Sequence, residues 1–247
     1  VSYYNQEGTY YLVYNDTNLS TILNYNLTGA IKTNITGTAT ETQGDNTTVL
    51  LLHFNNDSSV GENDNLIFDW GENKNNGSCY NGNCPSWTNA GMFGGSFYFD
   101  GSTSFEVNST TDFDFSDFTY SVWINASELS GSRTFIDLDF DEQWFGLGNN
   151  QYTVYGRCGW TRYGTATPGW HHVVWTVNGT DYFVYLDGEE IGSAAGCSAG
   201  VDVDHLIIGG VDTNAEYFIG SMDEISIWNR SLNASEVFDL YKLWEGI

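Results

Sequence analysis

The clearest alternation of apolar and polar positions lies near the end of the chain, over residues 218–228. Ile225 and Ile227 are separated by polar neighbours, and a period of two is typical of a strand with one face on a hydrophobic core. The carboxylate of Asp223 shares this parity. We therefore expect it to point toward the apolar side, where a charge needs backbone donors or a cation.

The period changes directly after this strand, to the spacing of a helix. Val237, Leu240, Tyr241 and Trp244 recur on one helical face. Asn233 followed by Glu236 predicts a capping box, and Leu232 with Val237 occupies the two positions of a hydrophobic staple. The sequence predicts a strand, a tight corner and one short amphipathic helix that packs on a surface.

Short strand patterns fill most of the chain before this corner. A buried run at 49–54 is followed by a loop rich in Asn, Asp and Gly, and Asp-Gly and Asn-Gly pairs separate many of the later runs. The other predicted strands are 96–99, 104–107, 118–124, 134–140, 144–147, 152–157, 170–177, 182–186, 205–208 and 222–228. Many short strands with almost no helix predict an all-β, two-sheet antiparallel jelly-roll sandwich.

Residues 1–48 form a separate, polar extension without Trp or Cys. Strand-like runs occur at 9–14, 23–27 and 31–35. The segment is too small and polar to hold a core alone, so we expect its strands to pair with the main domain, residues 49–247, or with a neighbouring molecule.

Composition narrows the classes of partner. Thirty-two Asp and Glu against seven Lys and Arg give a net charge of -25, which disfavours nucleic acid. Calcium or a cationic surface suits this charge, although acidity alone also serves solubility. No apolar run reaches membrane-spanning length.

Four cysteines indicate disulfides. Of the three pairings we favour Cys79–Cys84, which closes a small loop, with Cys158–Cys197, which ties two distant loops together. A zinc site is the alternative, but the spacing lacks paired Cys-x-x-Cys knuckles.

Twelve Asn-x-Ser/Thr triplets also suggest a secreted or cell-surface glycoprotein, although an Asn-rich chain produces some by chance. The candidate N-linked glycan sites are Asn15, Asn18, Asn26, Asn34, Asn46, Asn56, Asn76, Asn108, Asn125, Asn178, Asn229 and Asn233.

Six motifs in order resemble the laminin-G-like, concanavalin A-like lectin and glucanase jelly-roll superfamily, over residues 49 to about 244. They lie at 51–57, 97–101, 118–124, 170–173, 185–188 and 220–229. The resemblance implies two stacked antiparallel sheets that bind glycans or proteins outside cells, often with one structural calcium. It does not imply catalysis, because lectins and hydrolases share the fold.

Calcium ligands follow from the same resemblance. The matching Asp of the last strand in related sandwiches binds calcium with groups from the first strand and a backbone carbonyl. This implies Asp223, Asp57 and the carbonyl of Gly101, with Asp69 as a further oxygen ligand. The alternative is that hydrogen bonds from the backbone satisfy Asp223 at a bulge.

Three aspartates alternate along one predicted strand at Asp137, Asp139 and Asp141. They resemble the acidic strand of sandwich-fold glycoside hydrolases. Those enzymes use Glu at the outer positions, and the shorter Asp side chain does not suit the constrained gap across a glycosidic bond. A solvated strand face explains the pattern better, so we expect no hydrolysis.

Other catalytic sets are missing from the sequence. His171 and His172 are adjacent on a strand and must point to opposite faces, so they cannot share a metal ion. Neither a Ser or Cys nucleophile with triad-like neighbours nor a Gly-rich phosphate loop is evident.

The most ligand-like segment runs from residue 157 to 170. It contains Arg157, Trp160, Arg162 and Tyr163, next to Cys158. Aromatic rings stack on sugar faces, and arginines hold carboxylated or sulfated sugars. The alternative is that these rings close an edge of the sandwich while the arginines offset nearby carboxylates.

Two functions fit these features. The first is a non-enzymatic extracellular recognition or adhesion module that binds a glycan or surface protein. The second is a structural subunit of a surface filament or coat, in which residues 1–48 complete the sheet of a neighbouring copy. A glycoside hydrolase is a distant third.

Overall fold

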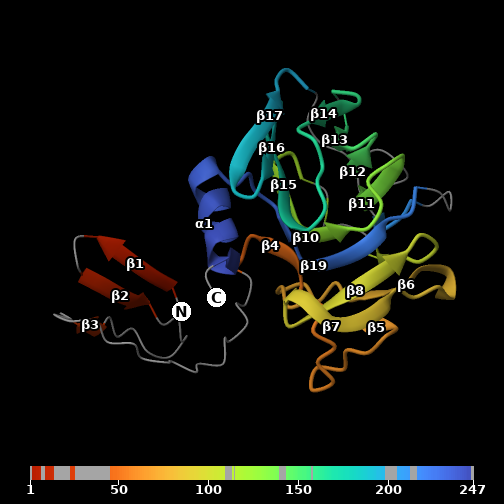
Figure 1. The fold of residues 1–247 in the computed structure, drawn as a ribbon, viewed down its shortest axis with the longest axis horizontal. Coiled ribbons are helices and arrows are strands. Elements are labelled where there is room, and N and C mark those ends of the chain that lie inside the picture. Colours follow the sequence, from red (N-terminus) through yellow and green to blue (C-terminus); the bar gives the residue numbers. More distant parts are fainter. Residues whose placement is uncertain are drawn as a thin grey trace. The chain divides into compact units, whose positions relative to one another are not determined.

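A computed structural model describes residues 2–6, 9–13, 23–25, 45–108, 113, 115–138, 143–156, 158–197, 205–211 and 216–245. The chain divides into two compact units (Figure 1). One contains Val1–Thr42 with Glu245–Ile247, and the other contains Gln43–Trp244.

The first unit holds a three-stranded antiparallel sheet in the order β1-β2-β3. Its strands are Ser2–Gln6, Thr9–Val13 and Leu23–Tyr25. They pair with one another, and the pairing expected with the main domain or with a neighbour stays a prediction. The strand expected at 31–35 lies outside the described residues.

The second unit contains two eight-stranded antiparallel sheets. Sheet I has the order β17-β16-β15-β10-β19-β8-β7, with β4 also paired to β19, and sheet II has the order β14-β13-β12-β11-β18-β9-β6-β5. The strands of sheet I are β4 (Thr48–Leu52), β7 (Ser86–Phe93), β8 (Gly95–Asp100), β10 (Phe118–Ala126), β15 (Trp170–Asn178), β16 (Asp181–Leu186), β17 (Glu189–Ala194) and β19 (Ile219–Trp228). Those of sheet II are β5 (Leu66–Ile67), β6 (Gly77–Cys79), β9 (Phe105–Asn108), β11 (Ser132–Leu138), β12 (Gln143–Gly148), β13 (Gln151–Tyr155), β14 (Thr161–Tyr163) and β18 (His205–Ile208). A single turn of 3-10 helix, Tyr80–Gly82, follows β6.

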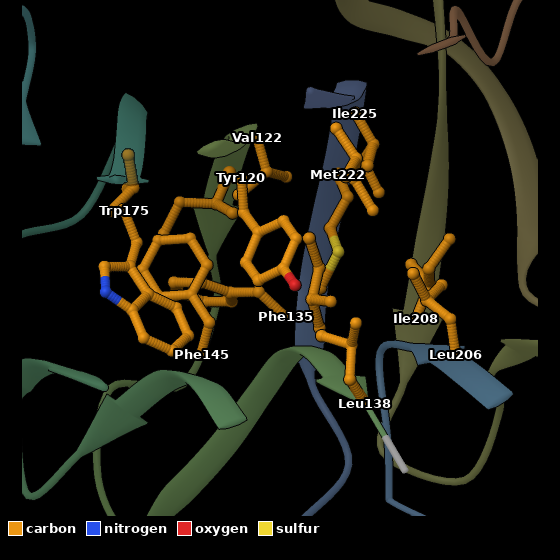
Figure 2. Close-up of a cluster of buried hydrophobic side chains, with 14 of the residues drawn as sticks. Tyr120, Val122, Phe135, Leu138, Phe145, Trp175, Leu206, Ile208, Met222 and Ile225 are labelled. Carbon is orange, nitrogen blue, oxygen red and sulfur yellow. The ribbon is translucent and has the colours of Figure 1, made fainter. Parts of the chain in front are cut away.

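The core lies between these sheets, because alternate residues of facing strands point inward. Trp175 of sheet I is fully buried and contacts Phe145 of sheet II, with ring centroids 6.0 Å apart. Figure 2 shows Met222 and Ile225 of β19 in the same cluster as Leu206 and Ile208 of β18. The architecture is an all-β sandwich, as the alternation predicted.

Helix α1 (Ala234–Glu245) covers part of the outer face of sheet I. Val237 and Leu232 are buried with Val174, Tyr185 and Trp228 in a second apolar cluster, as the predicted hydrophobic staple requires.

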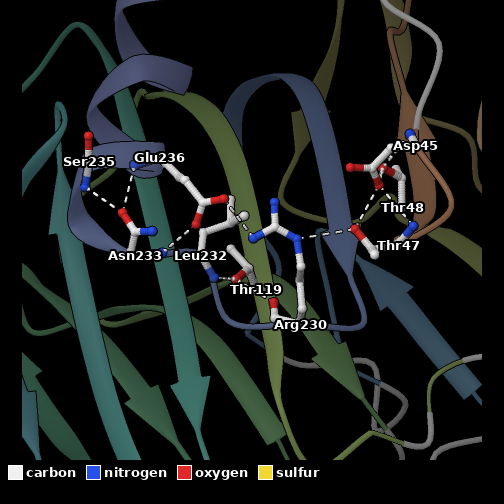
Figure 3. A network of polar contacts seen from close by, with 9 residues as sticks. All are labelled: Asp45, Thr47, Thr48, Thr119, Arg230, Leu232, Asn233, Ser235 and Glu236. Atoms are coloured by element: carbon white, nitrogen blue, oxygen red, sulfur yellow. Dashed lines mark hydrogen bonds and ion pairs between the residues drawn. The ribbon is translucent and has the colours of Figure 1, made fainter.

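The N-terminus of α1 has the predicted capping box (Figure 3). The side-chain oxygen of Asn233 accepts hydrogen bonds from the backbone N–H groups of Ser235 and Glu236, and Glu236 accepts one from Asn233 N–H. Arg230 pairs with Glu236 at 2.8 Å and donates to Thr47 Oγ1 at 3.3 Å, so this corner is tied to the start of β4.

Two disulfides, Cys79–Cys84 and Cys158–Cys197, are present, each with its Cα atoms 4.8 Å apart. The second lies where edge strands β14 and β17 approach each other. Tyr163 of β14 packs directly against Gly192 of β17, where any side chain would overlap the tyrosine ring. This edge of the sandwich is closed both covalently and by packing.

Candidate glycan-binding site

A row of aromatic residues crosses the outer face of sheet II. Trp144 is opposite Tyr155 in the β12–β13 pair and opposite Asp137 in the β11–β12 pair. Thr161 pairs with Val154, which places Trp160 across from Tyr155. Because Val154, Phe145 and Ile136 point into the core, their alternating neighbours face outward. We call Trp160, Tyr155 and Trp144 the aromatic platform.

Trp160 is the exposed member of the platform. Its side chain is 48% exposed, whereas Trp144 is completely buried. The ring of Trp160 lies 4.6 Å from that of Tyr155 and 5.1 Å from that of Trp144, centroid to centroid. The indole N–H of Trp144 donates a hydrogen bond to Thr134 Oγ1 at 2.8 Å. This bond fixes the orientation of the buried Trp144 ring. The platform therefore holds a large, rigid, half-exposed ring at the surface.

Arg162 lies beside the platform, on the same outer face. Arg162 of β14 pairs with Thr153 of β13. Thr153 is opposite Gly146 of β12, and Gly146 is opposite Thr134 of β11. The side chain of Arg162 is exposed, and its Nε would lie 3.2 Å from a Cβ added to Gly148. The missing side chain at residue 148 leaves room for the Arg162 side chain, which is directed toward Gly148, at the end of the strands away from Trp160.

The structure separates the residues that the sequence grouped into one ligand-binding loop. Tyr163 packs against the core and against Gly192, because neighbouring residues of a strand point to opposite faces. It belongs to the closed edge of the sandwich and is only partly exposed. Arg157 lies outside the described residues. Trp160 and Arg162 share the outer face, while Tyr155 and Trp144 are members that the sequence did not indicate.

Three of the four expected calcium ligands occupy other roles. Asp57 accepts a hydrogen bond from Ser59 N–H in a surface loop, and the interaction lowers the pKa of Asp57. Gly101 forms a turn after β8, in contact with Ile219.

Asp69 is fully buried, and its carboxylate accepts hydrogen bonds from the backbone N–H groups of Leu51, Gly71 and Asn75 at 2.7–2.9 Å. Burial raises the pKa of Asp69 despite these donors. Within the described ranges, no three His, Cys, Asp or Glu side chains form a group that could hold a metal ion. The four-ligand calcium set therefore stays a prediction.

Asp223 is placed by a β-bulge in β19. Glu224 adopts φ +50° where the β10–β19 register shifts. Asp223 is opposite Trp123, while Met222, Ile225 and Ile227 face the core. The bulge changes the phase of the strand, so the parity that we assigned to Asp223 from the sequence was wrong.

The surroundings of Asp223 are nonetheless unfavourable for a free carboxylate. It accepts hydrogen bonds from Phe93 N–H at 2.8 Å and from Glu224 N–H at 2.9 Å. Burial, then repulsion from Glu224, raises its pKa well above the usual value. Glu224 itself pairs with buried His53 at 2.9 Å. Two adjacent buried carboxylates are a place where a cation would relieve repulsion.

Calcium binding at Asp223 stays a prediction, and replacement by asparagine tests it. If a cation binds there, EDTA lowers the melting temperature of the parent, and Asp223→Asn both lowers it and removes the EDTA effect. Melting curves in calcium and in EDTA measure this. Asparagine keeps the acceptor for Phe93 N–H and removes a buried charge. A variant that melts at or above the parent in both buffers would therefore rule the cation out.

The two adjacent histidines lie on opposite faces of sheet I. His172 pairs with Trp123 and is fully buried, with Nε2 2.7 Å from Ser121 Oγ and the ring stacked on Trp123. Burial lowers the pKa of His172 to about 3. His172 is a neutral packing residue beneath Tyr241 of α1.

His171 forms a hydrogen-bonded series that the sequence did not reveal. Its Nδ1 is 2.8 Å from Asp187 Oδ2, and its Nε2 is 2.8 Å from Thr167 Oγ1. A hydroxyl, an imidazole and a carboxylate in series form a nucleophile relay when the imidazole acts as a base. Here Asp187, with the carbonyls of Pro168 and Thr167, raises the pKa of His171. The ring ties the start of β15 to the β16–β17 turn.

These two pKa shifts predict opposite effects of pH on stability. The raised pKa of His171 gives stability that is fully present below about pH 6.5 and is lost as pH rises through the folded-state pKa. Because the pKa of His172 is lowered in the folded state, its contribution to the free energy of unfolding is fully present above about pH 6.5. This contribution is lost as the pH falls from 6.5 toward 3.

Urea unfolding between pH 4 and 9 measures the pH dependence of both variants. Relative to the parent, His172→Gln should flatten the acid side of the stability profile, and His171→Gln should flatten the side above pH 6.5. Parallel profiles for parent and variants would show that neither ring titrates as described.

The candidate glycosylation sites differ in exposure. Asn46, Asn76, Asn178, Asn229 and Asn233 are exposed, and Asn56 and Asn125 are partly buried. Asn15, Asn18, Asn26 and Asn34 lie outside the described residues, as does the side chain of Asn108. Asn229 N–H donates to Thr47 O at 2.9 Å, which brings the triplets at 46 and 229 together.

Comparison with known proteins agrees with this architecture. Residues 99–238 match a family model described as the concanavalin A-like lectin/glucanases superfamily. A search of curated protein sequences finds no match.

Among solved structures, the binding domain of Paraclostridial Mosquitocidal Protein 1 has a TM-score of 0.62 and 21% identity, over 80% of this chain and 52% of that one. Domain 4 of AbnA, an extracellular arabinanase from Geobacillus stearothermophilus solved in complex with arabinotriose, has a TM-score of 0.59 and 19% identity, over 78% and 98% of the two chains. The binding domain of botulinum neurotoxin DC, solved in complex with SialylT, has a TM-score of 0.59 and 12% identity, over 80% and 51%. This chain therefore spans about half of each toxin binding domain. At these identities the likeness shows the fold alone.

Proposed function

Because the chain belongs to the concanavalin A-like lectin/glucanase superfamily, we propose that it is a non-catalytic extracellular module that binds a glycan on the outer face of sheet II. The observation that carries the proposal is the aromatic platform. Trp160 is held by two rings and is still 48% exposed. Because the ring is rigid and half-exposed, it presents a flat apolar face on which a sugar can stack.

The acidic strand supports a binding role over hydrolysis. Asp137 is only 1% exposed and lies in the same row as Trp144, so it is inaccessible to a glycosidic bond. Asp139 and Asp141 lie outside the described residues. A hydrolase needs two accessible carboxyl groups across the bond, and the buried Asp137 is not one of them.

The disulfides and the similar structures support an extracellular location and a glycan ligand. Two disulfides persist in an oxidising environment such as the cell exterior. In the described chain no helix is long and apolar enough to span a bilayer. Two similar structures were solved with glycans, arabinotriose and SialylT. Mass spectrometry of tryptic peptides from the secreted protein would test for N-glycans, which we expect first at the exposed Asn46, Asn229 and Asn233.

A glycan array followed by titration calorimetry tests the proposal. We expect saturable binding to a subset of glycans, with one site per chain. No binding to any glycan class, by a protein shown to be folded, would overturn it.

A further inference from the structure

We infer that the glycan that stacks on Trp160 carries an acidic group, a carboxylate or a sulfate, and that Arg162 holds this group. The inference rests on the proposed function and specifies the class of ligand. It comes from the position, exposure and charge environment of Arg162.

Arg162 differs from the other basic residues that the structure describes. Arg230 pairs with Glu236, Lys74 lies over Phe68, Lys242 lies over Tyr241, and Arg133 feels the charge of Glu128. Among the described residues, by contrast, no carboxylate forms an ion pair with Arg162. In a chain with a net charge of -25, an exposed guanidinium without a carboxylate partner marks a place where a negative charge is still to be supplied.

The neighbours of Arg162 on the outer face favour an incoming anion. Thr153, Gly146 and Thr134 follow it across the sheet, and none is charged. Asp137, in the platform row, lies three strands from Trp160, about 14 Å at the usual strand spacing, and is buried. Among the described residues, the neighbours of Arg162 on this face therefore carry no charge that would repel an anion.

The spacing of Trp160 and Arg162 restricts where the acidic group sits. The two residues are two positions apart on one face of the same segment, which separates their Cα atoms by about 7 Å. The side chain of Arg162 is directed toward Gly148, at the end of the strands away from Trp160. The acidic group therefore lies on the Gly148 side of the stacked sugar ring. Arginine suits the task because its planar fork binds a carboxylate or sulfate through two parallel hydrogen bonds.

Titration calorimetry with matched ligands tests the inference. The probes are a uronic acid oligosaccharide, the same oligosaccharide with its carboxyl groups reduced to alcohols, and a sulfated form of the reduced one. The parent should bind the acidic oligosaccharides at least about tenfold more tightly than the neutral form, as expected for charge-assisted hydrogen bonds. The carboxylated and sulfated probes identify which acid is preferred.

Variants of Arg162 provide the controls. Arg162→Gln should lower the ratio of acidic to neutral affinity to about one, and Arg162→Lys should retain part of the preference. Equal affinity of the parent for acidic and neutral probes would overturn the inference, while the platform would stand as a neutral sugar site. An equal loss for all probes in Arg162→Gln would also overturn it, since the residue would then only support Trp160. Failure of every probe and every other glycan to bind would instead count against the proposed function.

Discussion

Replacing Cys158 and Cys197 by serine is expected to lower the free energy of unfolding by about 4 kcal/mol. The two residues are 39 positions apart, so the bond removes much of the conformational freedom of the unfolded chain. Cys197 is buried, and the bond lies where edge strands β14 and β17 of the two sheets meet. Loss of the bond removes the covalent part of this closed edge and leaves the packing of Tyr163 on Gly192.

The Cys79–Cys84 bond is the matched control, because its residues are only five positions apart. The same chain-entropy relation gives about 2 kcal/mol for this short loop. Urea unfolding of the two double-serine variants compares the losses directly. Equal losses, or a larger loss for the short loop, would show that loop closure is not the main contribution of the longer bond.

Trp160→Ala is expected to weaken glycan binding by at least about tenfold, the cost typical of losing a tryptophan at the centre of a binding surface. Its stability should stay within about 1 kcal/mol of the parent, because nearly half of the side chain is already exposed. Calorimetric titration measures the affinity, and urea unfolding measures the stability.

Tyr98 and Phe238 are the controls for this substitution. They are 39% and 42% exposed, comparable with Trp160, but Tyr98 belongs to β8 of sheet I and Phe238 to α1. Replacing either by alanine should leave glycan affinity unchanged. If all three variants lose affinity alike, or if Trp160→Ala binds as the parent does, the platform is not the site.

Much of the fold follows from the sequence because alternation reports burial. The strands that line the core on one face, such as β10 and β15, have apolar residues at every second position. Edge strand β17 was missed for the converse reason. It has no buried residue, so nothing in its composition imposes a period of two.

The candidate site was predicted in part. Trp160 and Arg162 stood out by composition, whereas Trp144 and Tyr155 join them only through strand register. A signal for that register was present. Asn149 and Asn150, both at positive φ, form the two-residue turn between β12 and β13, and counting outward from it places Trp144 opposite Tyr155.

The orientation of Asp223 could not be predicted from alternation. A bulge at Glu224 shifts the strand by one residue, and no glycine marks it. The conformation is accompanied by the long-range pair of Glu224 with His53, 171 positions earlier in the chain. Contacts of this kind depend on the completed fold.

The central claim is that a glycan binds on the ring of Trp160, and the indole N–H signals of a ¹⁵N-labelled sample test it most directly. The chain has nine tryptophans, and Trp160→Phe assigns the relevant signal. On titration with the best glycan from the array, we predict a saturable shift of the Trp160 signal, with those of Trp87 and Trp228 unchanged. Saturable binding that leaves the Trp160 signal in place would contradict the claim.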